Sequence, residues 1–380
     1  MKIVFVTTQN LTGSTVRGRI LPLIHELAKN TTQDIHLIIH GPTNLPETNI
    51  TLHSSGLNPF VITPAGKKRL TGLPLIWHLL TNAIRAAYIL INLKAETIII
   101  SKPLPENVLA VTLATWFYKP AKIVLDADDF ELSANVLSSS LQRFAIHWAE
   151  RQASKLSANI IVATPFLGDH LAALSSTKKP ITLIPTGLTL TAQPTASSSG
   201  PRLVYTGSVS VASGHRVDLL PAILAEVIAK VPSSKLLIVG SGDDLDNLKQ
   251  QFAAKNLSDK IIWQEFVPMD QFPNLISPQD IFIDPIDTSI TNRAKSSFRV
   301  AAALALGLPV ITSNIGIRTQ LIPREFHQAF FAEAGSAPDY ASKIITAMQN
   351  PISLADQQLL KTKSQEYSWE KLAAVYQTQL

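Results

Sequence analysis

Short apolar runs recur along the chain and alternate with amphipathic stretches. The runs are rich in Ile and Val and lack strict alternation of apolar and polar residues, which is typical of parallel strands covered on both faces. Helical patterns separate them, so the order predicts parallel sheets with right-handed crossovers. In the N-terminal half, the predicted strands are 2–7, 35–39, 97–100, 123–125, 160–163 and 181–184.

Two amphipathic stripes in the same half predict helices. Ile20, Ile24 and Leu27 recur at helical spacing, and Pro22 is tolerated because it falls in the first turn. The second stripe consists of Leu137, Leu141, Phe144 and Trp148.

The composition changes at 189–201, a Ser/Thr/Pro-rich segment with few apolar groups that is typical of an interdomain linker. The alternation then resumes, and the chain ends in a helix opened by Ser368. The apolar face of this helix needs a partner, for which the first domain is a candidate. In this half, the predicted strands are 203–205, 235–239, 261–263, 281–283, 310–312 and 329–331.

These patterns predict an α/β protein of two doubly wound, Rossmann-like domains facing across a cleft. The domains are 1–188 and 202–366, joined by the linker 189–201 and followed by the helix 367–380, which we expect to pack back on the first domain. Ligands of open α/β sheets bind at the carboxyl ends of the strands. The pattern therefore predicts a ligand-binding pair of domains but no particular reaction.

Composition narrows the classes of protein. The chain has 380 residues, 46% of them hydrophobic and 16% charged, which suits two buried cores. The formal net charge of +5 fits an anionic ligand or an anionic membrane, and equally an ordinary solvated surface. No nucleic-acid-binding motif is present, so we expect no nucleic-acid partner. The absence of cysteine excludes disulfides and thiolate metal sites.

The stretch 72–93 comes nearest to a membrane span. It contains His78, Asn82, Arg85 and Asn92, which are costly in lipid. Because Lys67-Lys68-Arg69 precedes it, one interpretation is a peripheral membrane helix, and the other is a helix packed inside the first domain. The apolar run in MKIVFVTTQN is too short for a secretory signal, so we expect a cytoplasmic protein.

Two loops of the first domain are candidate sites. In 8–19 (TQNLTGSTVRGR), Gly13, Ser14 and Arg17 suit a phosphate or acceptor loop at a helix start, although an ordinary connection is the alternative. In 125–131 (LDADDFE), Asp126, Asp128 and Asp129 follow a buried strand. Carboxylates there suit acid/base work, orientation of hydroxyls or a divalent cation, and helix capping is the alternative.

The second domain has two further candidate segments. The loop 205–216 (YTGSVSVASGHR) is bracketed by glycines and resembles a phosphate cradle with a basic counter-charge. Basic residues and serines also open the predicted helix that ends at Gly307, and the free N–H groups there suit a diphosphate. The candidate donor-binding residues are Gly207, Ser208, Ser213, Arg216, Gly240, Lys295, Ser296, Ser297 and Arg299.

The order of several segments resembles the retaining GT-B glycosyltransferases grouped as family 4. The similar stretches are SANIIVATPFLGDHL, ITLIPTGL, LVYTGSVSVASG, KLLIVGSGDDLDNL, ALALGLPVITSNIG and YSWEKLAAVY, which span most of 157–376. The resemblance implies transfer of a sugar from a nucleotide diphosphate-sugar with retention and without a metal or other cofactor. It also implies that the donor binds the second domain and the acceptor the first. We expect the acceptor to be a glycan or lipid-linked acceptor of the envelope, or an exported glycan.

The chain departs from the family at named positions. The family's two glutamates, one of which binds the ribose, correspond to Ala294 and Ala302. Its diphosphate-binding Arg and Lys fall on Ser208 and Ser213, and its first-domain histidine falls loosely on Asp128. The sequence thus predicts a glycosyltransferase. The alternatives are a catalytically silent GT-B binding subunit and a sugar-nucleotide epimerase.

Overall fold

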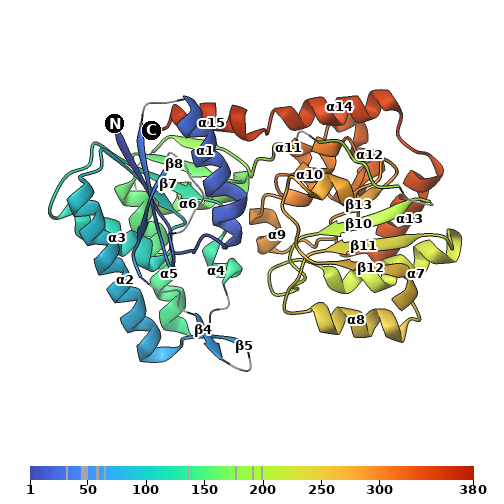
Figure 1. The fold of residues 1–380 in the computed structure, drawn as a ribbon, viewed down its shortest axis with the longest axis horizontal. Helices are drawn as coiled ribbons and strands as arrows, with labels where there is room; N and C mark the ends of the chain where they lie inside the picture. The colour runs from blue at the N-terminus through green and yellow to red at the C-terminus, as the bar shows by residue number, and fades with distance from the viewer. Residues whose placement is uncertain are drawn as a thin grey trace. The chain divides into compact units, whose positions relative to one another are not determined.

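A computed structural model describes residues 1–30, 33–43, 50–56, 60–63, 66–135, 137, 139–175, 178–190, 192–197 and 200–380. The chain divides into two compact units (Figure 1). The first unit comprises Met1–Pro185 together with Trp369–Leu380, and the second comprises Thr186–Ser368. The boundary therefore lies a few residues before the predicted linker 189–201, which belongs to the second unit, where the Thr195 amide donates to the Pro273 carbonyl.

The first unit is built on a parallel sheet of seven strands in the order β3-β2-β1-β6-β7-β8-β9. All six strands predicted here are present, and β3 is an additional edge strand that pairs with β2. A separate antiparallel pair is formed by β4 and β5. The strands are β1 (Lys2–Val6), β2 (Asp34–Ile39), β3 (Ile50–Ser54), β4 (Phe60–Thr63), β5 (Gly66–Arg69), β6 (Thr97–Ser101), β7 (Lys122–Ala127), β8 (Asn159–Val162) and β9 (Ile181–Leu183).

Helices cover both faces of this sheet (Figure 1). A π-helical turn, η1 (Val16–Ile20), leads into α1 (Leu21–Asn30), which packs beside the C-terminal helix α15 (Trp369–Gln377). Ile20, Ile24 and Leu27 are buried there, as their spacing predicts, together with Trp369 and Tyr376. The other helices are α2 (Gly72–Leu93), α3 (Pro105–Thr115), α4 (Glu131–Ala134), α5 (Ser140–Leu156) and α6 (Pro165–Leu174).

The predicted stripe on α5 does not face the core, because Leu141 and Phe144 are exposed while Ile146, Ala149 and Ala153 are buried. Within the described part of the chain, α2 is the one helix long and apolar enough to cross a membrane by length and composition.

The second unit contains a parallel sheet of six strands in the order β12-β11-β10-β13-β14-β15. Five of the six predicted strands are confirmed. The sixth is displaced, because Ala329 and Phe330 end a short helix and the strand begins at Phe331. The strands are β10 (Arg202–Thr206), β11 (Lys235–Val239), β12 (Ile261–Gln264), β13 (Ile281–Ile283), β14 (Val310–Ser313) and β15 (Phe331–Ala332).

Local sequence explains where the helices of this unit begin and end. Ser297 caps α10 by accepting from the Val300 amide, and Gly307 ends it at φ 71°, a left-handed conformation that favours glycine. The helices are α7 (Leu220–Lys230), α8 (Leu245–Ala254), α9 (Ile290–Ala294), α10 (Phe298–Leu306), α11 (Arg318–Leu321), α12 (His327–Phe330), α13 (Ala337–Gln349) and α14 (Leu354–Gln365). Single 3₁₀ turns are η2 (Val217–Leu219), η3 (Ser258–Lys260), η4 (Phe272–Leu275) and η5 (Arg324–Phe326).

Candidate functional site

Each sheet has a point at which the strand order reverses. In the first unit it lies between β1 and β6, and in the second between β10 and β13. The loops that follow these strands diverge, and open α/β sheets bind ligands in the resulting crevice. Most residues predicted from the sequence lie on these loops.

In the first unit, the loop after β1 meets the acidic segment after β7. Thr15 Oγ1 donates to Asp128 Oδ2 at 3.1 Å, and it accepts from the Gln9 side chain. The other carboxylate oxygen of Asp128 lies 3.3 Å from Lys102 Nζ. Two segments marked separately by the sequence are therefore parts of one site.

Lys102 organises the acids of this site. It follows β6 directly and adopts a left-handed φ of 72°. Its ammonium lies 2.7 Å from Asp129 Oδ2 and 3.6 Å from Glu131 Oε1. Although burial alone would lower it, Asp128, Asp129 and Glu131 together raise the pKa of Lys102 well above its usual value. The lysine is thus a permanent positive charge among three carboxyls.

Burial perturbs the acids themselves. It raises the pKa of the Asp128 carboxyl, against the effect of Lys102. It also raises the pKa of Glu131 from 4.5 to about 7, again opposed by Lys102. Glu131 Oε2 accepts from Asn135 Nδ2 at 2.7 Å. Glu131 is buried, whereas the Asp128 side chain is partly exposed, so Asp128 is the carboxyl of this pair that can accept hydrogen bonds from sugar hydroxyls.

Asp126 has a structural position. Its carboxylate accepts from Arg19 Nη2 at 2.7 Å and from the Tyr376 hydroxyl at 3.1 Å. Arg19 also donates to the carbonyls of Ile184 and Pro185. These contacts join η1, β7 and α15 to the segment Ile184–Pro185. Asp126, which the sequence grouped with Asp128 and Asp129, therefore uses its carboxylate for contacts inside the first unit.

The predicted phosphate loop is more open than the acidic cluster. Ser14 and Arg17 are exposed, and the chain becomes helical at Ser14. A β-carbon at Gly13 would come within 2.4 Å of Gln9 Oε1, so glycine lets the loop close tightly on itself. The contact between Gly13 and Gln9 does not involve the Ser14 hydroxyl.

In the second unit, two glycine-containing loops form a backbone floor. A β-carbon at Gly240 would lie 2.1 Å from the Gly207 carbonyl oxygen, and one at Gly242 would lie 2.2 Å from that of Val209. Gly207 has φ 121° and Gly240 has φ 143°, conformations that other residues rarely adopt. The loops after β10 and β11 can therefore meet because Gly240 and Gly242 carry no β-carbon.

Arg299, predicted to bind the donor, is built into the core. Its guanidinium donates to the Asp284 carboxylate, to the Thr206 carbonyl at 2.6 Å and to the Tyr205 hydroxyl at 3.1 Å. Asp284, which is fully buried, also accepts from Arg318 at 2.7 Å. Although burial opposes it, the two arginines hold the pKa of Asp284 well below its usual value.

His215, in the loop after β10, completes this network. Its Nδ1 lies 2.8 Å from Arg299 Nη2. Burial and the neighbouring Arg299 lower the pKa of His215 well below its usual value, so the neutral ring accepts from the guanidinium. The loop after β10 is thereby fixed to the start of α10.

The remaining predicted donor residues are distributed around the same loop. The Lys295 ammonium donates to the Ser213 carbonyl, and the Ser208 carbonyl accepts from the Tyr205 hydroxyl at 2.6 Å. Ser296 Oγ accepts from the Thr186 amide at 3.0 Å, and Ser297 Oγ donates to Asp284. Lys295 is thereby held against the loop after β10 and Ser297 joins the Asp284–Arg299 pair, whereas Ser296 contacts Thr186 instead.

Arg216 is partly exposed and paired. Its guanidinium lies 2.7 Å from Asp218 Oδ2 and 3.3 Å from Asp287 Oδ2. The positions that correspond to the family's glutamates, Ala294 and Ala302, are buried, with 1% and 0% of their surface exposed. Their methyl groups fill core space and offer no acceptor for a ribose hydroxyl.

Sequence reasoning missed Lys102, Thr15 and Asp284. A signal existed for two of them: Lys102 and Asp284 each follow a buried strand directly, as Asp128 does. Among the described residues, no group of three or more His, Asp or Glu is arranged to hold a metal ion.

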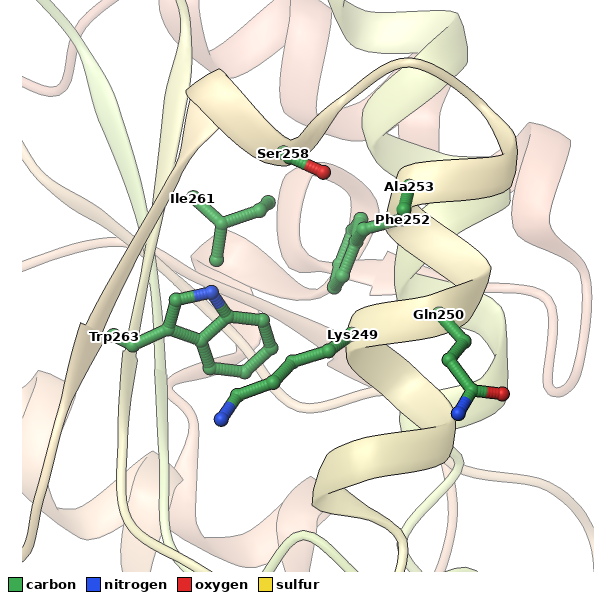
Figure 2. Close-up of a pocket in the computed structure, with 7 residues that line it drawn as sticks. All are labelled: Lys249, Gln250, Phe252, Ala253, Ser258, Ile261 and Trp263. Carbon is green, nitrogen blue, oxygen red and sulfur yellow. The ribbon is translucent and has the colours of Figure 1, made fainter.

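A separate hollow of about 390 Å³ lies on the second unit (Figure 2). It is formed between α8 and the edge strand β12, with Trp263 and Phe252 facing it and the Lys249 ammonium 5.6 Å from the Trp263 ring centre. None of the predicted site residues lines it.

Comparisons with known proteins agree with this architecture. Residues 208–365, about two-fifths of the chain, match the family model "Glycosyl transferases group 1". No curated protein sequence matches the chain. The family match lies wholly within the second unit, where the candidate donor residues occur.

Solved structures match over nearly the whole chain. A sucrose-phosphate synthase from Thermosynechococcus elongatus has a TM-score of 0.75 at 16% identity, covering 99% of this chain and 97% of its own. Anabaena HepE in complex with UDP-glucose has a TM-score of 0.74 at 14% identity and 100% coverage of both chains. The lipopolysaccharide outer core galactosyltransferase WaaB has a TM-score of 0.68 at 11% identity, covering 100% and 99%. These likenesses confirm the predicted GT-B fold.

Proposed function

We propose that this chain, whose second unit carries a group 1 glycosyltransferase domain, transfers a sugar from a nucleotide diphosphate-sugar to a glycan acceptor. The observation that carries the proposal is the family match over 208–365, which includes the loop after β10 and the start of α10. The acidic site of the first unit supplies the polar groups that sugar hydroxyls require. Reaction with retention is part of the proposal and follows the family resemblance.

For the donor, we place the diphosphate on the loop after β10. Gly207 and Gly240 hold the loops after β10 and β11 close together, and Lys295 supplies positive charge beside Ser213. Because HepE was solved with UDP-glucose, a UDP-sugar is the first donor to test. Arg299 supports this loop from beneath through Thr206 and His215.

For the reaction, we propose that the Asp128 carboxylate binds the hydroxyls of the reacting sugars and that Lys102 holds this carboxylate in place. An ionised carboxylate accepts two hydroxyl hydrogen bonds at once. Thr15 and Lys102 contact Asp128 on its two oxygens, which restricts its rotation. We propose that the acceptor binds the first unit. The acceptor is a glycan or lipid-linked glycan of the envelope, or an exported glycan, and the enzyme is cytoplasmic.

A second candidate is a silent binding subunit that holds a nucleotide-sugar without turning it over. The buried Ala294 and Ala302 favour it, because they replace the two family glutamates with groups that bind no hydroxyl. The two functions share donor binding and differ in chemistry.

A thermal-shift screen against nucleoside diphosphates and nucleotide diphosphate-sugars shows whether the protein binds a donor, as both the transferase and the silent subunit require. Specific binding stabilises the native state by about 2.7 kcal/mol at a hundredfold excess over Kd. Donors that stabilise the protein are then incubated with it, and released nucleotide is measured. Release supports the transferase, stabilisation without release supports the silent subunit, and no stabilisation by any donor overturns both.

A further inference from the structure

Large apolar side chains are exposed along one face of α2. The opposite face packs into the first unit through Ala83, Ala87 and Leu90, all at most 5% exposed. The outer stripe recurs every three or four residues, the spacing of one helix face. It consists of Leu73, Trp77, Leu80, Ile84 and Tyr88, which are 41–79% exposed.

Further large apolar side chains are exposed on the helices α3 and α5. Helix α3 packs against both α2 and α5, and Figure 1 shows α2 and α3 side by side. At the end of α3, Trp116 and Phe117 are 73% and 72% exposed, and on α5 Phe144 and Trp148 are 68% and 37% exposed. We call these residues, with Leu141 and the α2 stripe, the aromatic face.

Three of the chain's five tryptophans, Trp77, Trp116 and Trp148, belong to the aromatic face. Tryptophan and tyrosine favour the boundary between water and lipid, where an apolar ring and a polar N–H or O–H are both satisfied. Exposed apolar surface of this extent marks an interaction site more often than an ordinary surface.

The exposed charges within the three helices α2, α3 and α5 have one sign. The exposed charged residues of α2, α3 and α5 are all basic: Arg85, Arg143, Arg151 and Lys155. The two acidic residues of these helices, Glu106 and Glu150, are buried at 8% and 1% exposure. Basic residues on the same helices as exposed aromatic side chains complement an anionic surface. They disfavour a second copy of the same face, because like charges would then oppose each other.

We propose that the first unit docks on an anionic phospholipid surface through the aromatic face, with α2 lying along the membrane plane. The α2 stripe inserts its side chains at the headgroup boundary, and the arginines and lysine contact lipid phosphates. The helix lies flat because its inner face is held by α3 along the unit, and spanning the bilayer would expose the polar Asn82 and His78 to lipid.

Vesicle flotation tests this docking. Vesicles of neutral phosphatidylcholine are compared with vesicles that also contain anionic phosphatidylglycerol, at low and high salt. We expect binding to the anionic vesicles, weaker at high salt because the charges are screened, and a blue shift of tryptophan emission. The double variant Trp77→Asp, Ile84→Asp should lower the partition coefficient by about tenfold or more.

Matched controls lie outside the aromatic face. Leu354, 82% exposed on the second unit, takes the same change as Leu354→Asp and should leave binding unchanged. The pair Arg143→Glu, Lys155→Glu should weaken binding to anionic vesicles, and Lys230→Glu, Lys255→Glu should not. Circular dichroism and thermal unfolding establish that each variant is folded.

Two results would overturn the docking proposal. One is equal binding of wild type and Trp77→Asp, Ile84→Asp. The other is no vesicle binding together with a concentration-dependent dimer that the same substitutions dissociate, which would assign the face to a second copy. Because the readouts are partition and fluorescence, failure here is independent of donor binding.

Discussion

The Thr15 hydroxyl donates to the Asp128 carboxylate at 3.1 Å, across 113 positions of the sequence. This contact joins the loop after β1 to the acidic segment after β7. Lys102, from the strand between them in the sheet, approaches the other oxygen of Asp128. A carboxylate oriented from both sides is the central element of the proposed acceptor and transfer site.

The substitution Asp128→Asn tests the transfer role. If Asp128 positions sugar hydroxyls in the transition state, turnover should fall by about a hundredfold or more while donor affinity changes little. Steady-state kinetics with equilibrium binding of the donor separate the two effects. Asp169→Asn, an exposed carboxylate on α6, is the matched control. Equal turnover in Asp128→Asn and wild type would remove Asp128 from the mechanism.

The substitution Lys295→Ala tests the donor site. Loss of one charge-assisted contact to a phosphate should weaken nucleoside diphosphate binding by about tenfold or more. Calorimetric titration measures the affinity. Arg293→Ala, which removes an exposed charge two residues away, should leave it nearly unchanged. If both variants bind as tightly as wild type, the diphosphate does not lie beside Lys295.

The close approach of Gly240 to Gly207 can be tested by measuring the stability of the folded protein. A β-carbon at Gly240 would lie 2.1 Å from the Gly207 oxygen, an atom of the main chain that cannot turn aside. Gly240→Ala should therefore lower the free energy of unfolding by roughly 3 kcal/mol or more. At Gly18, within η1, no atom lies within 4 Å of the added carbon, so Gly18→Ala should be neutral or stabilising by up to about 1 kcal/mol. Similar denaturant midpoints for both variants would contradict this account of the loops.

Glu131 should make stability depend on pH. Burial raises the pKa of its carboxyl from 4.5 to about 7. Between these values the folded protein retains a proton that the unfolded chain has released, so stability falls as pH rises through this window. The excess stability of wild type over Glu131→Gln should thus be greatest below about pH 4.5 and decline by of the order of 3 kcal/mol by pH 8.

Urea unfolding at a series of pH values measures this difference. The exposed Glu265 provides the control, because Glu265→Gln should follow the wild-type profile. A difference between wild type and Glu131→Gln that is constant from pH 4 to about 8 would mean that Glu131 titrates normally in the folded protein.

The strands of the sheet centres were predictable because they are buried on both faces and read as continuous Ile- and Val-rich runs. Two of them, β11 and β13, have the predicted bounds. The edge strand β3 was missed, since its sequence ITLHS mixes polar and apolar residues on a half-exposed edge. The stripe on α5 predicted a helix, which is present, but not its exposure, because periodicity reveals an apolar face without showing what covers it.

The loops that form the candidate site were predictable from the sequence, whereas the contacts between their side chains were less so. The position of Asp128 at a strand end was visible in the sequence. Its contacts with Thr15 and Lys102 depend on the strand order, which places β6 beside β7. Arg299 resembled a phosphate ligand because the sequence did not reveal that Asp284, fifteen positions earlier, would take its guanidinium into the core.

Release of nucleoside diphosphate from a nucleotide diphosphate-sugar by the folded protein tests the central claim most directly. Each donor that stabilises the protein is incubated with wild type and with Asp128→Asn, and the released nucleotide and free sugar are resolved by chromatography. The account predicts release by wild type, enhanced by a glycan acceptor, and release lower by about a hundredfold in Asp128→Asn at unchanged donor affinity. Tight donor binding with no release by wild type, with or without acceptors, would contradict it and leave a binding subunit.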